Sequence, residues 1–456
     1  MKIFHYSLGL PPYRSGGLTK YSCDLMMEQA RQGDDVYLLF PGQIRDLDGE
    51  PEIKFYSNYN GVKTFELINP LPVPLLNGIS KPNFFMRSCN KKIFINVLKD
   101  NYVKIVHIHT FMGLYIEFLY ACKELSIKIV YTTHDYFGMC TKCNFIDFNG
   151  QLCKTIDINK CIECNSINSY SINTIRILQS KGYRYLKNVG IIPFLKAIIY
   201  KAGKLKLFHK KNQIKTDLIN RQEYESLLFY YESIFKLIDK YIFNSNIAKE
   251  IFNRYISSDD RVISITHNNI KDNRIKRTIN HNLLRISYMG PAKAYKGYFL
   301  ICDVIKKLYK NGTTDVVLNV YGNDEQFDKQ PNIKHHGKYS YSQIGNIFNN
   351  TDILIVPSIC YETFGFITLE AISYGIPVIA TENVGSKDLL ISNNYKKGII
   401  IEPDKESIYN CIKDLCVNKI FLYELNNNIL IDTFIYTIRD HYKEIKQLYV
   451  NEIENV

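Results

Sequence analysis

The stretch "DILIVPSICYETFGFITLEAISYGIPVIAT", residues 352–381, decides the fold of the second half of the chain. A short apolar run opens it, a loop and a helical segment follow, and Gly375 and Pro377 precede a second apolar run. Short apolar runs bounded by turn residues are typical of buried strands, and a helix between two strands indicates a βαβ unit. The stretch therefore predicts parallel strands connected by a helix.

Two carboxylates, Glu362 and Glu370, flank the apolar middle of this stretch. If the helix begins near Phe364, its first N–H groups lack partners and carry the positive end of the helix dipole. We therefore expect the backbone of Phe364, Gly365 and Phe366 to bind a phosphate, with glycine allowing close approach. Glu370 lies about two turns into the helix, where its carboxylate can accept hydrogen bonds from two adjacent sugar hydroxyls. Glu362 lies in the loop before the helix. Ordinary surface carboxylates are the alternative for each glutamate.

The same alternation of apolar runs and helical patterns appears in both halves of the chain. At 456 residues the chain exceeds what one hydrophobic core normally serves. We expect an α/β protein of two doubly wound parallel-sheet domains facing a cleft. The predicted parts are an N-terminal domain over 1–270, a nucleotide-binding domain over 280–430 and a C-terminal helix over 431–456 that packs back on the N-terminal domain. The N-terminal domain includes a cysteine-rich loop over 136–165, a basic helical insert over 166–233, a helix over 84–99 and a strand over 261–269.

Two further loops carry residues suited to phosphate. Gly290 ends a predicted strand, and Lys296 follows it closely, so that a cation accompanies a glycine that allows close approach. Gly16 and Gly17 form the turn between the first strand and helix, which faces the cleft in the predicted architecture. A solvated lysine and an ordinary glycine turn are the alternatives.

In order along the chain, these motifs resemble the retaining glycosyltransferases of glycosyltransferase family 4, which have the GT-B fold. The resemblance covers nearly all of the chain outside the basic insert. It rests on "SGG" (15–17), "VHIHT" (106–110), "TTHD" (132–135), "HNN" (267–269), "G…KG" (290–297), "PS" (357–358), the "E…FG…EA…G-x-PV" pattern (362–378) and "VGS" (384–386).

The resemblance implies a role for each candidate residue. Glu362 would bind the transferred sugar and Glu370 the donor ribose. The diphosphate would contact Lys296, Gly290, the backbone of residues 364–366, and Gly16 and Gly17. His134 would lie beside the reacting sugar, so that Glu362, His134 and Lys296 are the catalytic candidates. His109 and Asp135 would line the acceptor side, the alternative for both histidines being a structural role. No catalytic cofactor is expected.

One position departs from the family pattern. The family often has an arginine directly after the glycine of the "G…KG" motif, whereas this chain has Pro291. Lys293 is the nearest replacement cation.

Five cysteines lie within 25 residues, from Cys140 to Cys164. Two Cys-x-x-Cys pairs separated by 17 residues have the spacing of a four-thiolate zinc site. The loop also resembles a subgroup of these transferases that have His-Asp-Tyr-Trp, then a cysteine, then a later Cys-x-x-Cys; this chain has His-Asp-Tyr-Phe at 134–137. That resemblance implies the ligands Cys140, Cys153, Cys161 and Cys164, with Cys143 as the extra or alternate thiol. We expect a structural zinc site; free thiols and an iron–sulfur cluster are the alternatives.

The net charge of +12 arises almost entirely from residues 165–216, which contain no Asp or Glu. This segment mixes lysines with aliphatic residues, a composition that suits an anionic membrane surface. An exposed lysine-rich hairpin is the alternative, and nucleic acid is disfavoured because no recognition motif accompanies the charge. The eleven basic residues are Arg176, Lys181, Arg184, Lys187, Lys196, Lys201, Lys204, Lys206, Lys210, Lys211 and Lys215.

The chain has neither the pattern of a signal peptide nor an apolar run of eighteen residues. We expect a bacterial cytoplasmic enzyme, peripheral at the inner face of the cytoplasmic membrane. It would move a sugar from a UDP- or GDP-sugar to a hydroxyl of a glycan or lipid-linked acceptor in capsule, lipopolysaccharide or exopolysaccharide synthesis. A sugar-nucleotide epimerase of the same fold and a non-catalytic binding protein, favoured by Pro291, are the alternatives.

Overall fold

The computed structural model describes residues 1–192, 221–277, 282–323, 330–392, 395–432 and 435–454, and it forms two compact units. The first contains Met1–Phe243, Phe252–Ile263 and Ile438–Val456, and the second contains Asn244–Ile251 and Ser264–Thr437. The main boundary between the units lies between Ile263 and Ser264. The polar segment over residues 268–277 belongs to the second unit, where Asn273 N–H donates to the Ser373 carbonyl at 2.9 Å.

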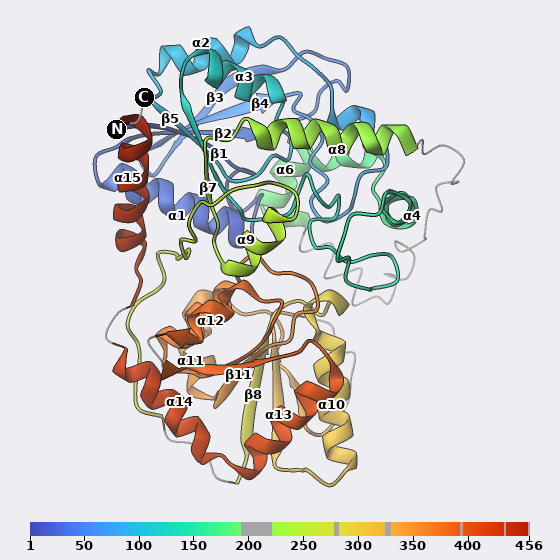
Figure 1. Ribbon diagram of the computed structural model, residues 1–456, viewed down its shortest axis with the longest axis vertical. Coiled ribbons are helices and arrows are strands. Elements are labelled where there is room, and N and C mark those ends of the chain that lie inside the picture. The colour runs from blue at the N-terminus through green and yellow to red at the C-terminus, as the bar shows by residue number, and fades with distance from the viewer. Residues whose placement is uncertain (193–220, 278–281, 324–329, 393–394, 433–434, 455–456) are drawn as a thin grey trace. The chain divides into compact units, whose positions relative to one another are not determined.

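A seven-stranded sheet forms the centre of the first unit (Figure 1). Its order is β3-β4-β2-β1-β5-β6-β7, and every neighbouring pair is parallel except β3 and β4. The strands are β1 (Lys2–Tyr6), β2 (Asp35–Pro41), β3 (Glu52–Tyr59), β4 (Val62–Ile68), β5 (Ile105–Ile108), β6 (Lys128–Thr132) and β7 (Lys240–Ile242). The chain moves outward from β1 in one direction and from β5 in the other, so the topological switch point lies between these two strands.

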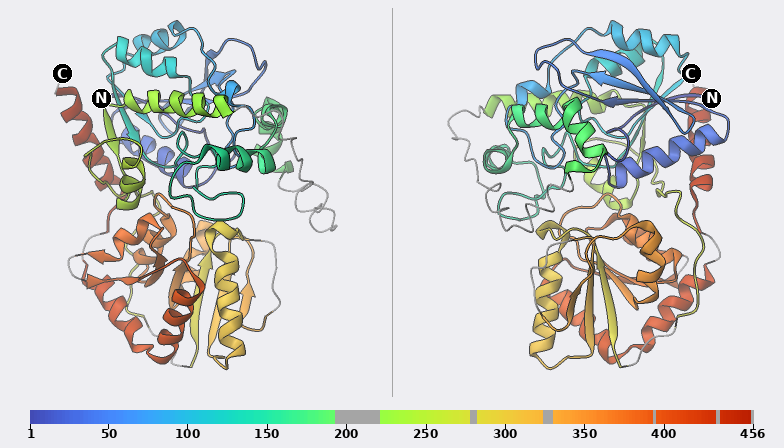
Figure 2. Two further views of the ribbon diagram at one scale, coloured as in Figure 1. Left: turned by 45° about the vertical axis from the view of Figure 1, so that its right-hand side comes forward. Right: turned by 180° about the vertical axis from the view of Figure 1, so that it is seen from behind.

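Eight helices of the described chain belong wholly to the first unit. They are α1 (Gly17–Arg31), α2 (Lys92–Asp100), α3 (Ile116–Glu124), α4 (Ile158–Asn168), α5 (Ile172–Leu178), α6 (Lys181–Asn188), α8 (Arg221–Lys236) and α15 (Ile438–Glu454). The C-terminal helix α15 lies against α1 (Figures 1 and 2), where the Tyr21 hydroxyl is 2.7 Å from His441 Nε2. Helix α9 (Asn246–Asn253) begins in the second unit and ends in the first.

Two predicted elements differ from the structure. The helix expected over 84–99 begins only at Lys92, where Asn90 accepts a hydrogen bond from the Lys92 N–H group, and Pro82–Phe85 forms a short 3-10 turn. The strand expected over 261–269 is reduced to one bridge between Phe243 and Val262. Ile263 and Ile265 of this segment are buried without continuing the sheet.

The second unit contains a six-stranded, wholly parallel sheet of order β10-β9-β8-β11-β12-β15. Its strands are β8 (Leu284–Met289), β9 (Val316–Tyr321), β10 (Ile333–His335), β11 (Ile353–Val356), β12 (Val378–Thr381) and β15 (Gly398–Ile401). Its helices are α10 (Tyr298–Lys310), α11 (Ile344–Asn349), α12 (Phe366–Ser373), α13 (Lys405–Val417) and α14 (Ile420–Ile431), and β13 (Ile391–Ser392) pairs with β14 (Tyr395–Lys396) in a short hairpin. Here the switch point lies between β8 and β11.

Helices cover both faces of this sheet. Along β11, Ile353 and Ile355 pack in one apolar cluster with α10, α13 and α14, whereas Leu354 and Val356 pack in another with α11 and α12. Strands buried on both faces are characteristic of doubly wound parallel sheets and explain the continuous apolar runs in the sequence.

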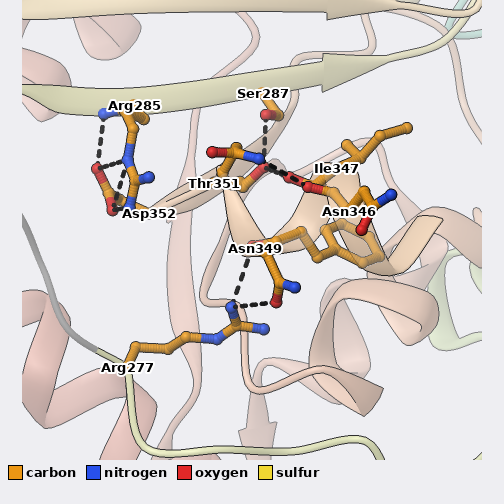
Figure 3. Close-up of polar contacts among 10 residues, drawn as sticks. Arg277, Arg285, Ser287, Asn346, Ile347, Asn349, Thr351 and Asp352 are labelled. Carbon is orange, nitrogen blue, oxygen red and sulfur yellow. Dashed lines mark hydrogen bonds and ion pairs between the residues drawn. The ribbon is translucent and has the colours of Figure 1, made fainter. Parts of the chain in front are cut away.

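Polar contacts join β8 to β11 at the amino ends of both strands (Figure 3). Arg285 Nη2 donates to Asp352 Oδ1 at 2.6 Å, and the Arg285 backbone N–H donates to Oδ2 at 2.8 Å. The hydroxyls of Ser287 and Thr351 are 2.7 Å apart. These contacts lie at the opposite strand ends from the loops that carry the candidate residues.

We predict that Arg285→Met lowers the free energy of unfolding of the second unit by about 2 kcal/mol, because it leaves the buried Asp352 carboxylate without its cation. Urea denaturation measures the loss. Adding Asp352→Asn should recover part of it; if the double variant is no more stable than Arg285→Met, the assignment to the ion pair is wrong.

Candidate functional site

Two loops meet at the switch point of the second unit. The loop after β8 carries Lys296 in the short turn Ala294–Lys296, and the loop after β11 carries Glu362. Lys296 Nζ lies 2.9 Å from Glu362 Oε2, and the Ser358 hydroxyl donates to Glu362 Oε1. The carboxyl ends of strands at a switch point are where doubly wound sheets bind ligands.

The backbone around Glu362 is held on both sides. Its N–H group donates to the Asn383 carbonyl at 2.8 Å, and its carbonyl accepts from Gly385 N–H at 2.9 Å. Farther along, Ser386 N–H donates to the Phe364 carbonyl at 2.8 Å. The loop after β12 therefore positions Glu362 independently of its side-chain contacts.

Glycine is required at two positions of this site. Gly297 has φ +73°, and a Cβ there would lie 1.8 Å from the Pro357 carbonyl oxygen, so the loops after β8 and β11 can touch only without a side chain. Gly365 has φ +107° and caps α12. Positive φ is a conformation that glycine adopts readily and other residues rarely.

The helix α12 begins at Phe366 and not near Phe364 as predicted, because Gly365 leaves the helical region of φ and ψ. Phe364 is buried in the preceding loop, and its ring lies 5.6 Å from that of Phe366. Glu370 therefore lies about one turn into the helix, roughly 6 Å from its start at 1.5 Å per residue.

Two residues that the sequence did not single out contact Glu370. The Tyr341 hydroxyl donates to Oε1 at 3.0 Å, and His267 Nε2 lies 3.0 Å from the same oxygen without the alignment of a hydrogen bond. His267 opens the quoted "HNN" motif, which was a signal for it, whereas nothing in the sequence pointed to Tyr341. The Tyr341 hydrogen bond orients the buried Glu370 carboxylate, and the His267 ring lies against the same oxygen.

Electrostatics keep Lys296 charged. Burial opposes its charge, but the attraction and hydrogen bond of Glu362 outweigh this and raise the pKa of Lys296 above its ordinary value. Gly290, directly after β8, donates its N–H to the Tyr321 carbonyl at 2.9 Å. The Pro291 carbonyl accepts from the Tyr288 hydroxyl at 2.8 Å, and Lys293 is exposed.

In the first unit, the remaining predicted residues lie at the carboxyl ends of β1, β5 and β6. Gly16 caps α1 with φ +109°, and Gly17 is the first residue of that helix. His109 Nδ1 lies 3.3 Å from His134 Nε2. Asp135 accepts hydrogen bonds from the Thr110 hydroxyl at 2.9 Å and from Phe137 N–H at 3.0 Å.

The sequence did not predict that His5 and His107 would join His109 in a buried cluster. The three ligand nitrogens lie within 4.8 Å of one another, the only such triad among the described residues. Every ring nitrogen already has a hydrogen-bond partner, since His5 contacts Gln29 and His109, His107 contacts Tyr449 and Thr132, and His109 contacts His5 and His134. The three rings are therefore part of a buried hydrogen-bond network.

We predict that Asp135→Asn raises the Tm of the first unit at pH 7.5. Burial raises the pKa of the Asp135 carboxyl to about 6, against the hydrogen bonds from Phe137 and Thr110. Ionising the Asp135 carboxyl therefore lowers the free energy of unfolding as the pH rises from 3.8 through 6. The loss is at most about 3 kcal/mol, at about 1.4 kcal/mol for each pH unit. The gain should vanish below pH 4. A Tm of Asp135→Asn equal to or lower than that of the wild type at pH 7.5 would contradict this prediction.

The cysteine loop divides its thiols into two groups. Cys140, Cys153, Cys161 and Cys164 line one cavity of about 30 Å³. Cys143 lies apart, with its Sγ 3.6 Å from the Leu75 carbonyl oxygen. Within the described chain, no three of these sulfurs lie within 4.8 Å of one another.

The basic insert is only partly described, since Lys196, Lys201, Lys204, Lys206, Lys210, Lys211 and Lys215 lie outside the described residues. Arg184 does not contribute to a charged surface, because it is buried in an ion pair with Glu66 at 2.9 Å. Lys181 is exposed on α6, and the side chains of Ile177 on α5 and Tyr185 on α6 are exposed as well. Of the described helices, none is both long and apolar enough to traverse a bilayer.

Comparison with known proteins relates both units to sugar transferases. Residues 269–429 match the family "Glycosyl transferases group 1", and residues 15–148 match "Glycosyltransferase Family 4". Sucrose-phosphate synthase 4 of Arabidopsis thaliana is 26% identical over 149 residues, which are 32% of this chain and 14% of that protein. An uncharacterised 41.2 kDa protein in the cps region of Klebsiella pneumoniae is 33% identical over 115 residues, 24% of this chain and 30% of that protein.

The chain thus matches less than a third of the length of these relatives. Among solved structures, Anabaena HepE in complex with UDP has a TM-score of 0.56 and 11% identity, with 99% of this chain and 100% of that chain covered. The predicted fold class is confirmed. With one family model on each unit, the chain belongs to the group 1 glycosyltransferases of glycosyltransferase family 4 and has their GT-B fold.

Proposed function

We propose that the protein is a retaining glycosyltransferase that moves a sugar from a nucleoside diphosphate to an acceptor hydroxyl. The observation that carries this proposal is the ion pair of Lys296 and Glu362, 2.9 Å apart beside the start of α12. A cation and a helix N-terminus together suit a diphosphate. The UDP in the HepE structure supports a nucleotide donor.

In this reaction the bond from the sugar C1 to the diphosphate oxygen breaks, and a bond from C1 to the acceptor oxygen forms on the same face. The acceptor proton passes to the departing diphosphate. Lys296 and the first N–H groups of α12 stabilise the charge that develops on that group. Glu370 binds the ribose, Glu362 binds the transferred sugar, and His134 acts on that sugar in the catalytic step.

Turnover of UDP- and GDP-sugars, with and without glycan or lipid-linked acceptors, tests this function. A thermal-shift screen first selects the donor, because a bound ligand stabilises the folded state by mass action. Acceptor-dependent release of nucleoside diphosphate is expected. Conversion of the donor sugar without an acceptor would indicate an epimerase, and binding without turnover would indicate a non-catalytic protein.

We further propose that the acceptor is lipid-linked, that the enzyme works in surface polysaccharide synthesis, and that α5 and α6 contact the anionic inner face of the cytoplasmic membrane. Ile177 and Tyr185 are 64% and 65% exposed, Lys181 is exposed, and Lys187 is half-buried with its Nζ 5.5 Å from the centre of the Tyr13 ring. Exposed apolar residues among lysines favour an anionic lipid surface. The Klebsiella relative from a cps region accords with a role in surface glycans.

Flotation with phosphatidylglycerol vesicles tests the membrane surface. Lys181→Glu with Lys187→Glu should reduce the bound fraction severalfold, since each lysine near such a surface contributes about 1 kcal/mol. Lys310→Glu with Lys413→Glu makes the same charge change in the second unit and should bind like the wild type. Equal flotation of all three proteins would remove this part of the proposal.

The four cysteines that line one cavity fit a structural metal in their donor chemistry, because thiolates are the preferred ligands of structural zinc. We propose that Cys140, Cys153, Cys161 and Cys164 bind one zinc ion, which requires their sulfurs to move together. Elemental analysis should find one zinc per chain, lost in Cys161→Ser and retained in Cys143→Ser. Absence of zinc and iron from the wild type would refute the site.

A further inference from the structure

We propose that Gln29 and His5 are positioning residues that set the tautomer of His134 through a chain of three hydrogen bonds. The proposal rests on the function above, in which His134 acts on the transferred sugar. It adds two residues, from α1 and β1, that no sequence motif marked.

The chain of hydrogen bonds runs through the buried interior of the first unit. Gln29 Oε1 is 2.7 Å from His5 Nε2, His5 Nδ1 is 2.9 Å from His109 Nε2, and His109 Nδ1 is 3.3 Å from His134 Nε2. Gln29, His5 and His109 are fully buried. Water therefore does not compete for these ring nitrogens.

The donor at each step follows from the chemistry of neutral imidazole, in which one nitrogen carries the proton and the other accepts. The Gln29 carbonyl oxygen accepts, so His5 is protonated at Nε2 and accepts at Nδ1. His109 then donates from Nε2 and accepts at Nδ1. His134 consequently donates from Nε2, and its Nδ1 is the accepting nitrogen.

A second branch orients the Gln29 amide at the start of this chain. Gln29 Nε2 lies 3.5 Å from the Tyr449 hydroxyl, which lies 2.5 Å from His107 Nδ1. His107 Nε2 lies 2.7 Å from the Thr132 hydroxyl. Gln29 donates to Tyr449, Tyr449 donates to His107, and His107 donates to Thr132. In this arrangement each of these polar atoms has a partner, and the Gln29 oxygen faces His5.

All members of the chain are neutral near pH 7, which makes the tautomer meaningful. Burial lowers the pKa of His5 and of His134 to about 3 and the pKa of His109 well below its ordinary value. With its proton on Nε2, His134 has Nδ1 as its accepting nitrogen, the form to which a sugar hydroxyl donates. In the opposite tautomer Nδ1 is a donor, so the same hydroxyl would have to accept instead of donate.

Nitrogen NMR of protein labelled with ¹⁵N-histidine tests the tautomer without substrate, because protonated and bare ring nitrogens resonate far apart. His134→Gln identifies the His134 signals. We expect His134 to be protonated at Nε2 in the wild type, and Gln29→Met to give a mixture of tautomers. Gln32→Met, the same change at the exposed end of α1, should leave the signals as in the wild type. Protonation of His134 at Nδ1 in the wild type would overturn the proposal.

Transfer kinetics then separate the tautomer proposal from the proposed function. Gln29→Met should lower kcat at least about tenfold with little change in KM, as a wrong histidine tautomer does in hydrolases. An unchanged kcat despite mixed tautomers would contradict a positioning role. If the wild type shows the expected tautomer but transfers no sugar, the proposed function fails and the hydrogen-bond chain stands.

Discussion

Glu362→Gln is expected to lower kcat/KM for sugar transfer by about 100-fold or more while the protein remains folded. Glutamine keeps the shape of the side chain and its contact with Ser358, but it removes the charge that pairs with Lys296 at 2.9 Å. The backbone of residue 362 is fixed by Asn383 and Gly385, so the loop keeps its conformation. Steady-state transfer assays and the Tm measure the two effects separately.

Glu406→Gln is the matched control, because Glu406 is an exposed glutamate in the first turn of α13. It should show the activity of the wild type. Transfer by Glu362→Gln at more than half the wild-type rate would show that the ion pair is structural and that the sugar is bound elsewhere.

Gly297→Ala is expected to have the largest effect on stability. The added Cβ would meet the Pro357 carbonyl oxygen at 1.8 Å, in a backbone conformation with φ +73° that alanine rarely adopts. The overlap and the backbone strain together should cost about 3 kcal/mol, or about 10 °C in the Tm of a domain of this size. Donor binding should fall as well, because the loop that carries Lys296 must move.

Gly312→Ala separates the backbone strain at Gly297 from the steric overlap of the added Cβ with Pro357. Gly312 lies beyond the other end of α10 with φ +88°, but a Cβ there would have nothing within 4 Å. It should cost only about 1 kcal/mol, the ordinary penalty of a left-handed conformation. Equal losses in the two variants would mean that the contact with Pro357 contributes nothing.

The local motifs of the second unit could be predicted because their chemistry is contained in short segments. The strand, loop and helix around Glu362 follow from apolar periodicity, and the pairing of that loop with Lys296 follows from the switch point of a parallel sheet. The start of α12 was predicted two residues early, since periodicity does not report the backbone angles of Gly365.

The histidine network could not be predicted from local patterns. Gln29 and Tyr449 are 420 residues apart, and they meet because α15 returns to α1 in the first unit. Likewise, a count of charges assigned Arg184 to a basic surface, whereas the fold supplies Glu66 from β4 as its partner. Long-range pairing of this kind leaves no periodic signal in the sequence.

The exposed strand β3 shows another limit. Its residues mix charged and aromatic side chains, and all of them are exposed or half-buried, so no clean alternation marks the strand. It is recognisable as a strand only through its antiparallel pairing with β4 at the edge of the sheet.

The most direct test of the account is proton NMR of the product formed from the nucleotide sugar that stabilises the wild type. The account predicts transfer to an acceptor hydroxyl with the anomeric configuration of the donor retained, and transfer slowed by about 100-fold or more in Glu362→Gln. A product of inverted configuration, or turnover of the donor that is unaffected by Glu362→Gln, would contradict it.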